Sequence, residues 1–141
     1  MTGVDHIGIA VKSIAEALPF WRDALGMELL GIEVVESDKV RAAILKSPGA
    51  GGARIELLEP TSPDSPVARH LERRGPVIHH IALAVDDLAA TMATLRRAGR
   101  PAMDEVPRPG VEGTKVTFLH PHNAGGVLVE LTQPPAARRA T

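Results

Sequence analysis

The chain has no cysteine among its 141 residues. This absence excludes disulfide bonds, thiol nucleophiles and cysteine-ligated zinc, and it favours a cytoplasmic location. Aromatic side chains are also scarce, because Phe20, Trp21 and Phe118 are the whole set. The interior must therefore be built from aliphatic residues, and a hydrophobic content of 44% is enough for one packed domain.

An excess of either charge is lacking as well. The 16 Lys and Arg residues nearly balance the 17 Asp and Glu residues, for a net charge of −1. This balance gives no electrostatic basis for binding nucleic acid or a membrane surface. No apolar run approaches the roughly 20 residues of a membrane span, and the start lacks the basic-then-apolar pattern of a signal peptide. We expect a cytoplasmic protein without nucleic-acid or membrane partners.

The sequence contains an internal repeat. Two pairs of segments match at one offset of 74 residues: His6–Val11 (HIGIAV) with His80–Val85 (HIALAV), and Ile55–Pro60 (IELLEP) with Val129–Pro134 (VELTQP). One shared offset for two separate matches indicates a duplication. Each half then carries one histidine in its first segment and one glutamate in its last: His6 and Glu56, then His80 and Glu130.

Residue patterns predict an α+β fold in which each half is a βαβββ module. The first module, about 1–60, should have strands at 4–11, 28–35, 40–46 and 54–59 and a helix at 14–25, buried through Ile14, Leu18, Trp21 and Leu25. The second, about 77–134, should have strands at 77–85, 102–105, 114–119 and 127–132 and a helix at 88–98. A linker helix at 64–74 joins the modules within one domain of residues 1–134, and 135–141 should be a disordered tail.

Alternation along the strands predicts a cavity lined by the repeated histidines. Residues two apart share a face of a strand, so His6 lies with Gly8 and Ala10, and His80 lies with Ala82 and Ala84. Such small neighbours leave space that a packed core would fill. The two modules are therefore expected to form a curved eight-stranded half-barrel around this cavity.

The repeated histidines and glutamates suggest a metal site. Imidazole and carboxylate ligands suit divalent Co, Ni, Mn, Fe or Zn, and four protein ligands leave positions for substrate oxygens or water. His79 faces away from His80 on the strand and is interpreted as a structural or supporting residue. The other histidines, His70, His120 and His122, have no partner at the 74-residue offset.

Several longer motifs resemble one enzyme superfamily. They are DHIGIAV at 5–11, IELLEPTSPDSP at 55–66, HHIALAVDD at 79–87, DEVPRPG at 104–110 and FLHPHNAGGVLVELTQ at 118–133. The repeated module and the His, Glu, His, Glu set resemble the vicinal oxygen chelate superfamily, which includes glyoxalase I, extradiol dioxygenases and antibiotic-resistance proteins. The longer motifs are similar to those of the methylmalonyl-CoA epimerase family within it.

This resemblance implies a cytoplasmic, homodimeric isomerase of propionate metabolism. Its substrate would be an acyl-CoA thioester, and it would interconvert (R)- and (S)-methylmalonyl-CoA by proton abstraction through a metal-stabilised enolate. It implies one divalent ion, Co²⁺ first, with Mn²⁺, Ni²⁺, Zn²⁺ or Mg²⁺ as alternatives. The ligands carried over are His6, Glu56, His80 and Glu130, with Glu130 and Glu56 as candidate proton-transfer residues.

One position departs from the family pattern. Several members carry a second base on the strand that corresponds to 40–45, where the residues facing the cavity here should be Val40, Ala42 and Ile44. The expected position is Ala42, which has no carboxylate. Glu56 could serve as the second acid or base, another residue or water could do so, or the substrate could differ.

Three other functions share parts of this pattern. A glyoxalase I-type lactoylglutathione lyase uses the same ligand types but usually lacks the DSP linker and the GGVL segment before the last glutamate. An extradiol dioxygenase has an iron site of two histidines and one carboxylate. Glu56 would be a fourth protein ligand, which argues against this function. A non-catalytic binding protein of the resistance type would not need ligands in both halves.

Overall fold

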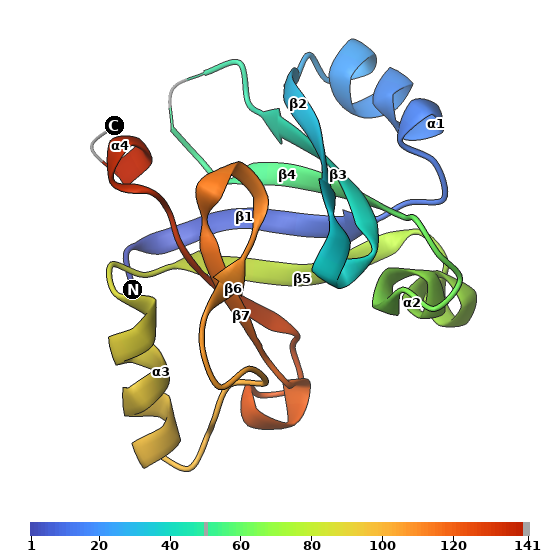
Figure 1. The fold of residues 1–141 in the computed structure, drawn as a ribbon. Helices are drawn as coiled ribbons and strands as arrows, with labels where there is room; N and C mark the ends of the chain where they lie inside the picture. The colour runs from blue at the N-terminus through green and yellow to red at the C-terminus, as the bar shows by residue number, and fades with distance from the viewer. Residues whose placement is uncertain (50, 140–141) are drawn as a thin grey trace. The chain divides into compact units, whose positions relative to one another are not determined.

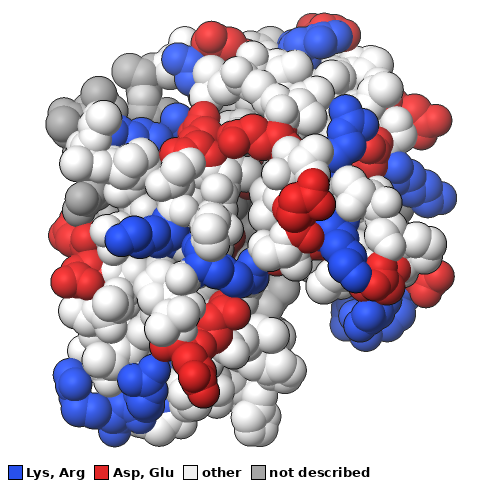
Figure 2. Space-filling model, viewed as in Figure 1, with Lys and Arg blue, Asp and Glu red and all other residues white. Residues whose placement is uncertain are grey.

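The computed structural model describes residues 1–49 and 51–139. The chain divides into two compact units, one of His6–His79 and one that joins Met1–Asp5 to the residues from His80 onward (Figure 1). None of the helices among the described residues is long and apolar enough to cross a bilayer. Acidic and basic side chains are interspersed over the face in Figure 2, in keeping with the balanced composition.

The first unit is built on four strands. Its elements are β1 (Gly3–Ala10), α1 (Ile14–Leu18), η1 (Pro19–Ala24), β2 (Glu28–Val35), η2 (Glu36–Asp38), β3 (Val40–Lys46), β4 (Arg54–Pro60) and α2 (Pro66–Arg74). β2 runs antiparallel to β3, β3 antiparallel to β4, and β4 parallel to β1. The strands therefore lie in the order β2, β3, β4, β1, and the predicted βαβββ module is confirmed.

The second unit repeats this plan. Its elements are β5 (Val77–Ala84), α3 (Leu88–Arg97), β6 (Arg108–Pro109), η3 (Val111–Gly113), β7 (Lys115–Leu119), η4 (Pro121–Asn123), β8 (Val129–Gln133) and α4 (Ala136–Arg139). β5 is parallel to β8, β8 is antiparallel to β7, and β7 is antiparallel to β6. The order β5, β8, β7, β6 completes an α+β fold of two related modules, as predicted.

The predicted helix at 14–25 is only partly correct. Regular α-helix ends at Leu18, because Pro19 has no amide hydrogen to continue the ladder. A π-helical segment follows, in which the Leu25 amide donates to the Phe20 carbonyl at 3.0 Å. This wider turn changes the direction in which the following side chains point. As a result Leu25, which was expected in the core, is 51% exposed.

The strand predicted at 102–105 is absent from the described structure. Met103 makes one backbone hydrogen bond, to the Phe118 carbonyl at 2.8 Å. The Asp104 carboxylate instead accepts a hydrogen bond from the Thr117 hydroxyl at 2.8 Å, and Asp favours such turns over strands. Strand β7 pairs instead with β6, which has only two residues.

The predicted disordered tail is wrong for residues 136–139, which form α4. The Arg138 guanidinium makes ion pairs with Asp5 and, at 3.0 Å, with Glu112. These contacts hold the end of the described chain against its own unit. Residues 140 and 141 lie outside the described residues.

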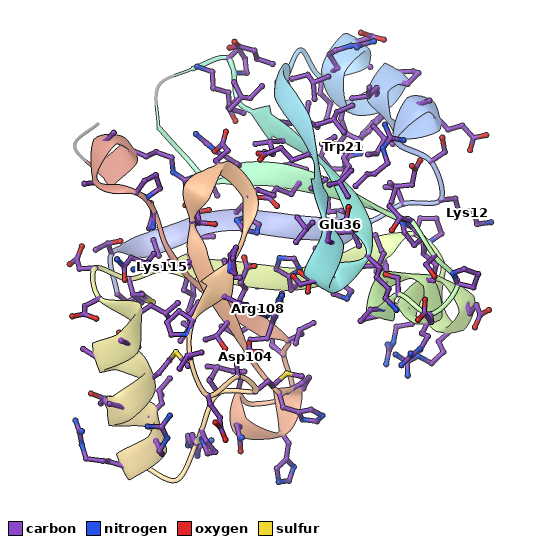
Figure 3. The ribbon with its side chains drawn as sticks, viewed as in Figure 1. Lys12, Trp21, Glu36, Asp104, Arg108 and Lys115 are labelled. Atoms are coloured by element: carbon purple, nitrogen blue, oxygen red, sulfur yellow. The ribbon has the colours of Figure 1, made fainter. Side chains whose placement is uncertain are left out.

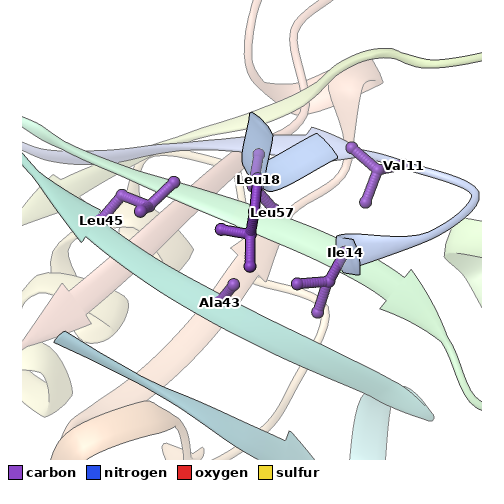
Figure 4. Packing of buried hydrophobic residues seen from close by; sticks show 6 residues of the cluster. All are labelled: Val11, Ile14, Leu18, Ala43, Leu45 and Leu57. Atoms are coloured by element: carbon purple, nitrogen blue, oxygen red, sulfur yellow. The ribbon is translucent and has the colours of Figure 1, made fainter. Parts of the chain in front are cut away.

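An aliphatic core covers one face of the first unit's strands. Figure 4 shows its members: Val11, Ile14, Leu18, Ala43, Leu45 and Leu57. They come from the helix and from strand positions that alternate with His6 and Glu56. The Ser13 hydroxyl caps α1 by accepting from the Glu16 amide at 3.2 Å. The helix therefore packs on the face opposite the histidine.

We expect Leu57→Ala to lower the free energy of unfolding by about 2–5 kcal/mol, because Leu57 is fully buried and the change leaves a cavity. Leu30→Ala is the matched control, since Leu30 is an exposed leucine in a strand of the same unit. Urea denaturation of both variants checks this. Equal losses in the two variants would contradict the assignment of the core.

Candidate metal centre

His6 and Glu56 form a buried pair in the first unit. Strand β1 lies parallel to β4 with Gly8 opposite Glu56, which puts both side chains on one face. His6 Nδ1 lies 3.2 Å from Glu56 Oε2, and the two side chains are only 5% and 7% exposed. A histidine and a glutamate 50 positions apart are thus brought into contact by the pairing of the module's first and last strands.

The second unit contains the equivalent pair. Strands β5 and β8 are parallel, with Ala82 opposite Glu130. His80 Nε2 lies 3.7 Å from Glu130 Oε2, and these side chains are 4% and 9% exposed. The duplication read from the sequence is therefore reproduced in which residues pair, although a different imidazole nitrogen faces the carboxylate in each unit.

Small residues surround the histidines as the alternation predicted. Gly8, Ala10 and Ala82 are buried beside them. The alternate positions carry larger side chains that pack on the opposite face. Ile9 packs against the aliphatic cluster of the first unit, and Leu83 packs against a cluster in the second unit, formed by Val85, Leu88, Met92, Leu119 and Leu131. Each module thus separates a packed face from a face that bears the buried polar pair.

The donor atoms of the two pairs fit a divalent metal ion. Burying a carboxylate is costly unless an opposite charge or hydrogen bonds compensate it. Each glutamate here lies beside an imidazole, and together they form the nitrogen and oxygen ligand set that first-row divalent ions bind. Only neutral imidazole can ligate, and its contact with a carboxylate orients the ring.

Sequence reasoning did not single out a second group beside His80. The Phe118 ring packs edge-on against the His80 ring, with centroids 5.3 Å apart. The Arg108 guanidinium lies 5.4 Å from the Phe118 centroid, and its Nε donates to Asp104 at 3.2 Å. Figure 3 labels Arg108, which belongs to β6, and Asp104. The sequence did contain a signal for this group, because Asp104 and Arg108 both belong to the DEVPRPG motif.

Comparisons with known proteins identify the family. Residues 5–118 match the model of the glyoxalase/bleomycin resistance protein/dioxygenase superfamily. The crystal structure of methylmalonyl-CoA epimerase from Mycobacterium tuberculosis superposes with a TM-score of 0.91 at 38% identity, covering 99% of this chain and 92% of that one. The chain belongs to the methylmalonyl-CoA epimerase family of this superfamily.

The chain is also similar to two curated bacterial proteins. The ethylmalonyl-CoA/methylmalonyl-CoA epimerase of Cereibacter sphaeroides is 34% identical over 92% of this chain and 96% of its own length. The protein YqjC of Bacillus subtilis, which is uncharacterized, is 41% identical over 95% of this chain and 94% of its own. Both similarities span nearly the whole chain.

Two further histidines form a pair in the first unit. The rings of His70 and His79 meet edge-on with centroids 4.9 Å apart. Burial, and then the nearby His70, lower the pKa of His79 from 6.5 to about 4. Burial likewise lowers the pKa of His70, with Arg73 and Arg74 adding to the effect. His79 is therefore neutral at physiological pH, which suits a structural role next to His80.

The low pKa of His79 should make stability depend on pH. Its pKa is lower in the folded chain than its ordinary value, so the unfolded chain binds the proton first on acidification. Stability should fall between about pH 6.5 and 4. His79→Gln should reduce this slope by up to about 1.4 kcal/mol per pH unit.

Urea unfolding across this pH range, in chelator so that no metal contributes, measures that slope. The exposed His122 provides the control variant His122→Gln, which should keep the wild-type slope. Equal slopes in the wild type and His79→Gln would show that His79 does not titrate in this way.

Proposed function

We propose that this chain is a metal-dependent epimerase that interconverts (R)- and (S)-methylmalonyl-CoA. The carrying observation is the buried His–Glu pair that recurs in both modules, at 3.2 Å and 3.7 Å. Relatives at 34% and 38% identity are named as methylmalonyl-CoA epimerases, and they cover nearly the whole chain. Together these support an acyl-CoA thioester as substrate.

The two pairs are proposed to bind one divalent ion, with Co²⁺ first and Mn²⁺, Ni²⁺, Zn²⁺ or Mg²⁺ as alternatives. The proposed ligands are His6, Glu56, His80 and Glu130. When bound, the ion supplies Lewis-acid stabilisation of the negative charge that develops on the thioester oxygen. His6 and His80 are held for this task by the strand pairing that also places their glutamates.

Epimerisation requires that a proton leave the carbon between the carboxylate and the thioester and return to its other face. The electron pair of the broken C–H bond moves onto the thioester oxygen, which gives an enolate. We assign Glu130 as one acid/base, because it is a buried carboxylate in the His80 pair. Glu56 is the candidate that the sequence suggested for proton transfer on the other face of the enolate. Its contact with His6 is equally suited to a role as a metal ligand.

The small neighbours of the histidines support room for a substrate on this face. Gly8, Ala10 and Ala82 present almost no side chain there. One relative is named for both ethylmalonyl-CoA and methylmalonyl-CoA, so both acyl chains belong in the assay.

We also expect the protein to be a cytoplasmic homodimer.

Deuterium uptake tests this function. Purified protein, with added Co²⁺ or with chelator, is incubated with methylmalonyl-CoA or ethylmalonyl-CoA in heavy water. Deuterium should appear at the carbon between the carboxylate and the thioester, and the two stereoisomers should interconvert in the metal-loaded sample. No exchange, with conversion of the methylglyoxal–glutathione hemithioacetal instead, would assign a lactoylglutathione lyase.

His80→Ala should abolish stoichiometric binding of the divalent ion, because it removes one ligand and leaves Glu130 without its imidazole neighbour. Elemental analysis after dialysis measures the metal content. His122→Ala, an exposed histidine outside both pairs, should retain one ion per chain. Full metal occupancy in His80→Ala would remove His80 from the ligand set.

Glu130→Gln should retain part of the metal, because an amide oxygen can still ligate, yet lose epimerisation by about 10²- to 10⁴-fold. Glu105→Gln, at an exposed glutamate of the same unit, is the control. The stereoisomer ratio over time, with metal content measured on the same samples, checks this. Wild-type epimerisation in Glu130→Gln would show that the proton is transferred elsewhere.

A further inference from the structure

The register of the second unit's strands places Phe118 on the face that carries the His80–Glu130 pair. Phe118 of β7 lies directly opposite Glu130 of β8, and Glu130 lies opposite Ala82 of β5. Directly opposed residues share a face of the sheet. His80 is two residues before Ala82 on β5 and therefore points to the same side. The edge-on contact between the His80 and Phe118 rings, with centroids 5.3 Å apart, follows from this register.

Arg108 joins this face from the next strand. It lies opposite Val116 of β7, which is two residues before Phe118 on the same side of that strand. Diagonal neighbours of this kind lie about 7–8 Å apart, within reach of a long side chain. The Arg108 guanidinium accordingly lies over the Phe118 ring, 5.4 Å from its centroid. Arginine suits such a contact, because its planar cation can stack on an aromatic face.

The Asp104 carboxylate holds that guanidinium. Its Oδ2 accepts a hydrogen bond from Arg108 Nε at 3.2 Å and another from the Thr117 hydroxyl at 2.8 Å. Thr117 is fully buried in β7, so its hydroxyl is a fixed donor. The side chains of Arg108 and Asp104 are only 23% and 30% exposed, which leaves their attraction less screened by salt than that of a surface pair. The contacts therefore continue from Asp104 through Arg108 and Phe118 to His80.

The orientation of a histidine ring is not set by its strand alone. The χ2 torsion of histidine is broad and roughly two-fold, so either ring nitrogen can face a given neighbour. In this unit Nε2 of His80 lies 3.7 Å from Glu130 Oε2. The two nitrogens are distinct to a metal ion, and the contacts of the rest of the ring decide which one is presented. A ring packed edge-on against Phe118 cannot turn about χ2 without displacing it.

The first unit offers an internal comparison. The residue at the 74-residue offset from Phe118 is Ile44, which lies opposite Glu56. Ile44 has no aromatic ring to meet an imidazole edge-on. In that unit the Nδ1 atom of His6 faces the glutamate, at 3.2 Å. The two units thus differ both in the side chain opposite the glutamate and in the imidazole nitrogen beside it.

We infer that Arg108 is a positioning residue for His80 and acts through Phe118. The inference rests on the proposed role of His80 as a metal ligand. The guanidinium, held by Asp104, keeps the Phe118 ring in place, and this ring keeps the His80 imidazole turned with Nε2 beside Glu130. All of these residues belong to the second unit.

The orientation of His80 can be measured without metal. The chain has two phenylalanines, Phe118 and the exposed Phe20, so selective phenylalanine labelling gives two ring systems in NMR spectra. The His80 ring signals are assigned by their loss in His80→Ala. Nuclear Overhauser contacts between the two rings are recorded in chelator for wild type, Arg108→Met, Arg108→Lys, Phe118→Leu and the double variant Arg108→Met/Phe118→Leu. Co²⁺ titration and urea unfolding follow on the same proteins.

Arg108→Met should weaken the contacts between the Phe118 and His80 rings and shift the His80 ring signals. Its affinity for Co²⁺ should fall by about 10- to 100-fold, as is usual when a group that orients a metal ligand is lost, while its urea midpoint stays close to that of the wild type. Arg108→Lys should recover part of the affinity, because the cation remains but the planar group does not. Arg96→Met, at an exposed arginine of the same unit, is the matched control and should behave as wild type.

The double variant tests whether Arg108 acts through Phe118. If it does, Arg108→Met should add almost nothing to the loss of Co²⁺ affinity that Phe118→Leu causes alone. Additive losses would overturn the inference, because Arg108 would then act independently of the ring. Unchanged His80 signals and Co²⁺ affinity in Arg108→Met would overturn it too, as would lost affinity with the ring contacts intact.

Failure of the proposed function would look different. A wild type that bound no Co²⁺ would remove the metal role of His80, while the ring contacts in chelator would still report whether Arg108 positions the imidazole.

Discussion

The burial of four ionisable side chains is the constraint on which the rest of the structure depends. Removing a carboxylate from water costs several kcal/mol even after the protein relaxes, and Glu56 and Glu130 are both nearly inaccessible. Each lies beside an imidazole on the neighbouring parallel strand. The pairing of the first and last strands in each module therefore brings these buried groups together. The helices must then occupy the other face of the strands.

The two faces of the first unit's strands differ in what they bury. On the helix side, Leu45, Leu57 and their neighbours form a buried aliphatic cluster. On the other side, glycine and alanine flank the histidines, and Ile44 and Leu58 are buried on the same face as Glu56. A substitution on the polar face can therefore change the packing as well as the reaction.

Most of the strands and the His–Glu pairs could be predicted from the sequence, because alternation and a shared offset are local or repeated signals. The misses have identifiable causes. Pro19 converts the end of the first helix into a π-helix, and Asp104 prefers its contact with Thr117 to a strand. The one-residue bulge at Leu30 in β2 becomes visible only in the pairing register of that strand with β3.

The first five residues pack with the second unit rather than the first, and the Thr2 amide donates to the Ala84 carbonyl at 2.8 Å. The repeat in the sequence and the division in packing therefore do not coincide. By its packing, the leading segment of the first repeat therefore belongs to the second unit. A polypeptide that contained the second repeat alone, cut in the linker, would lack this segment.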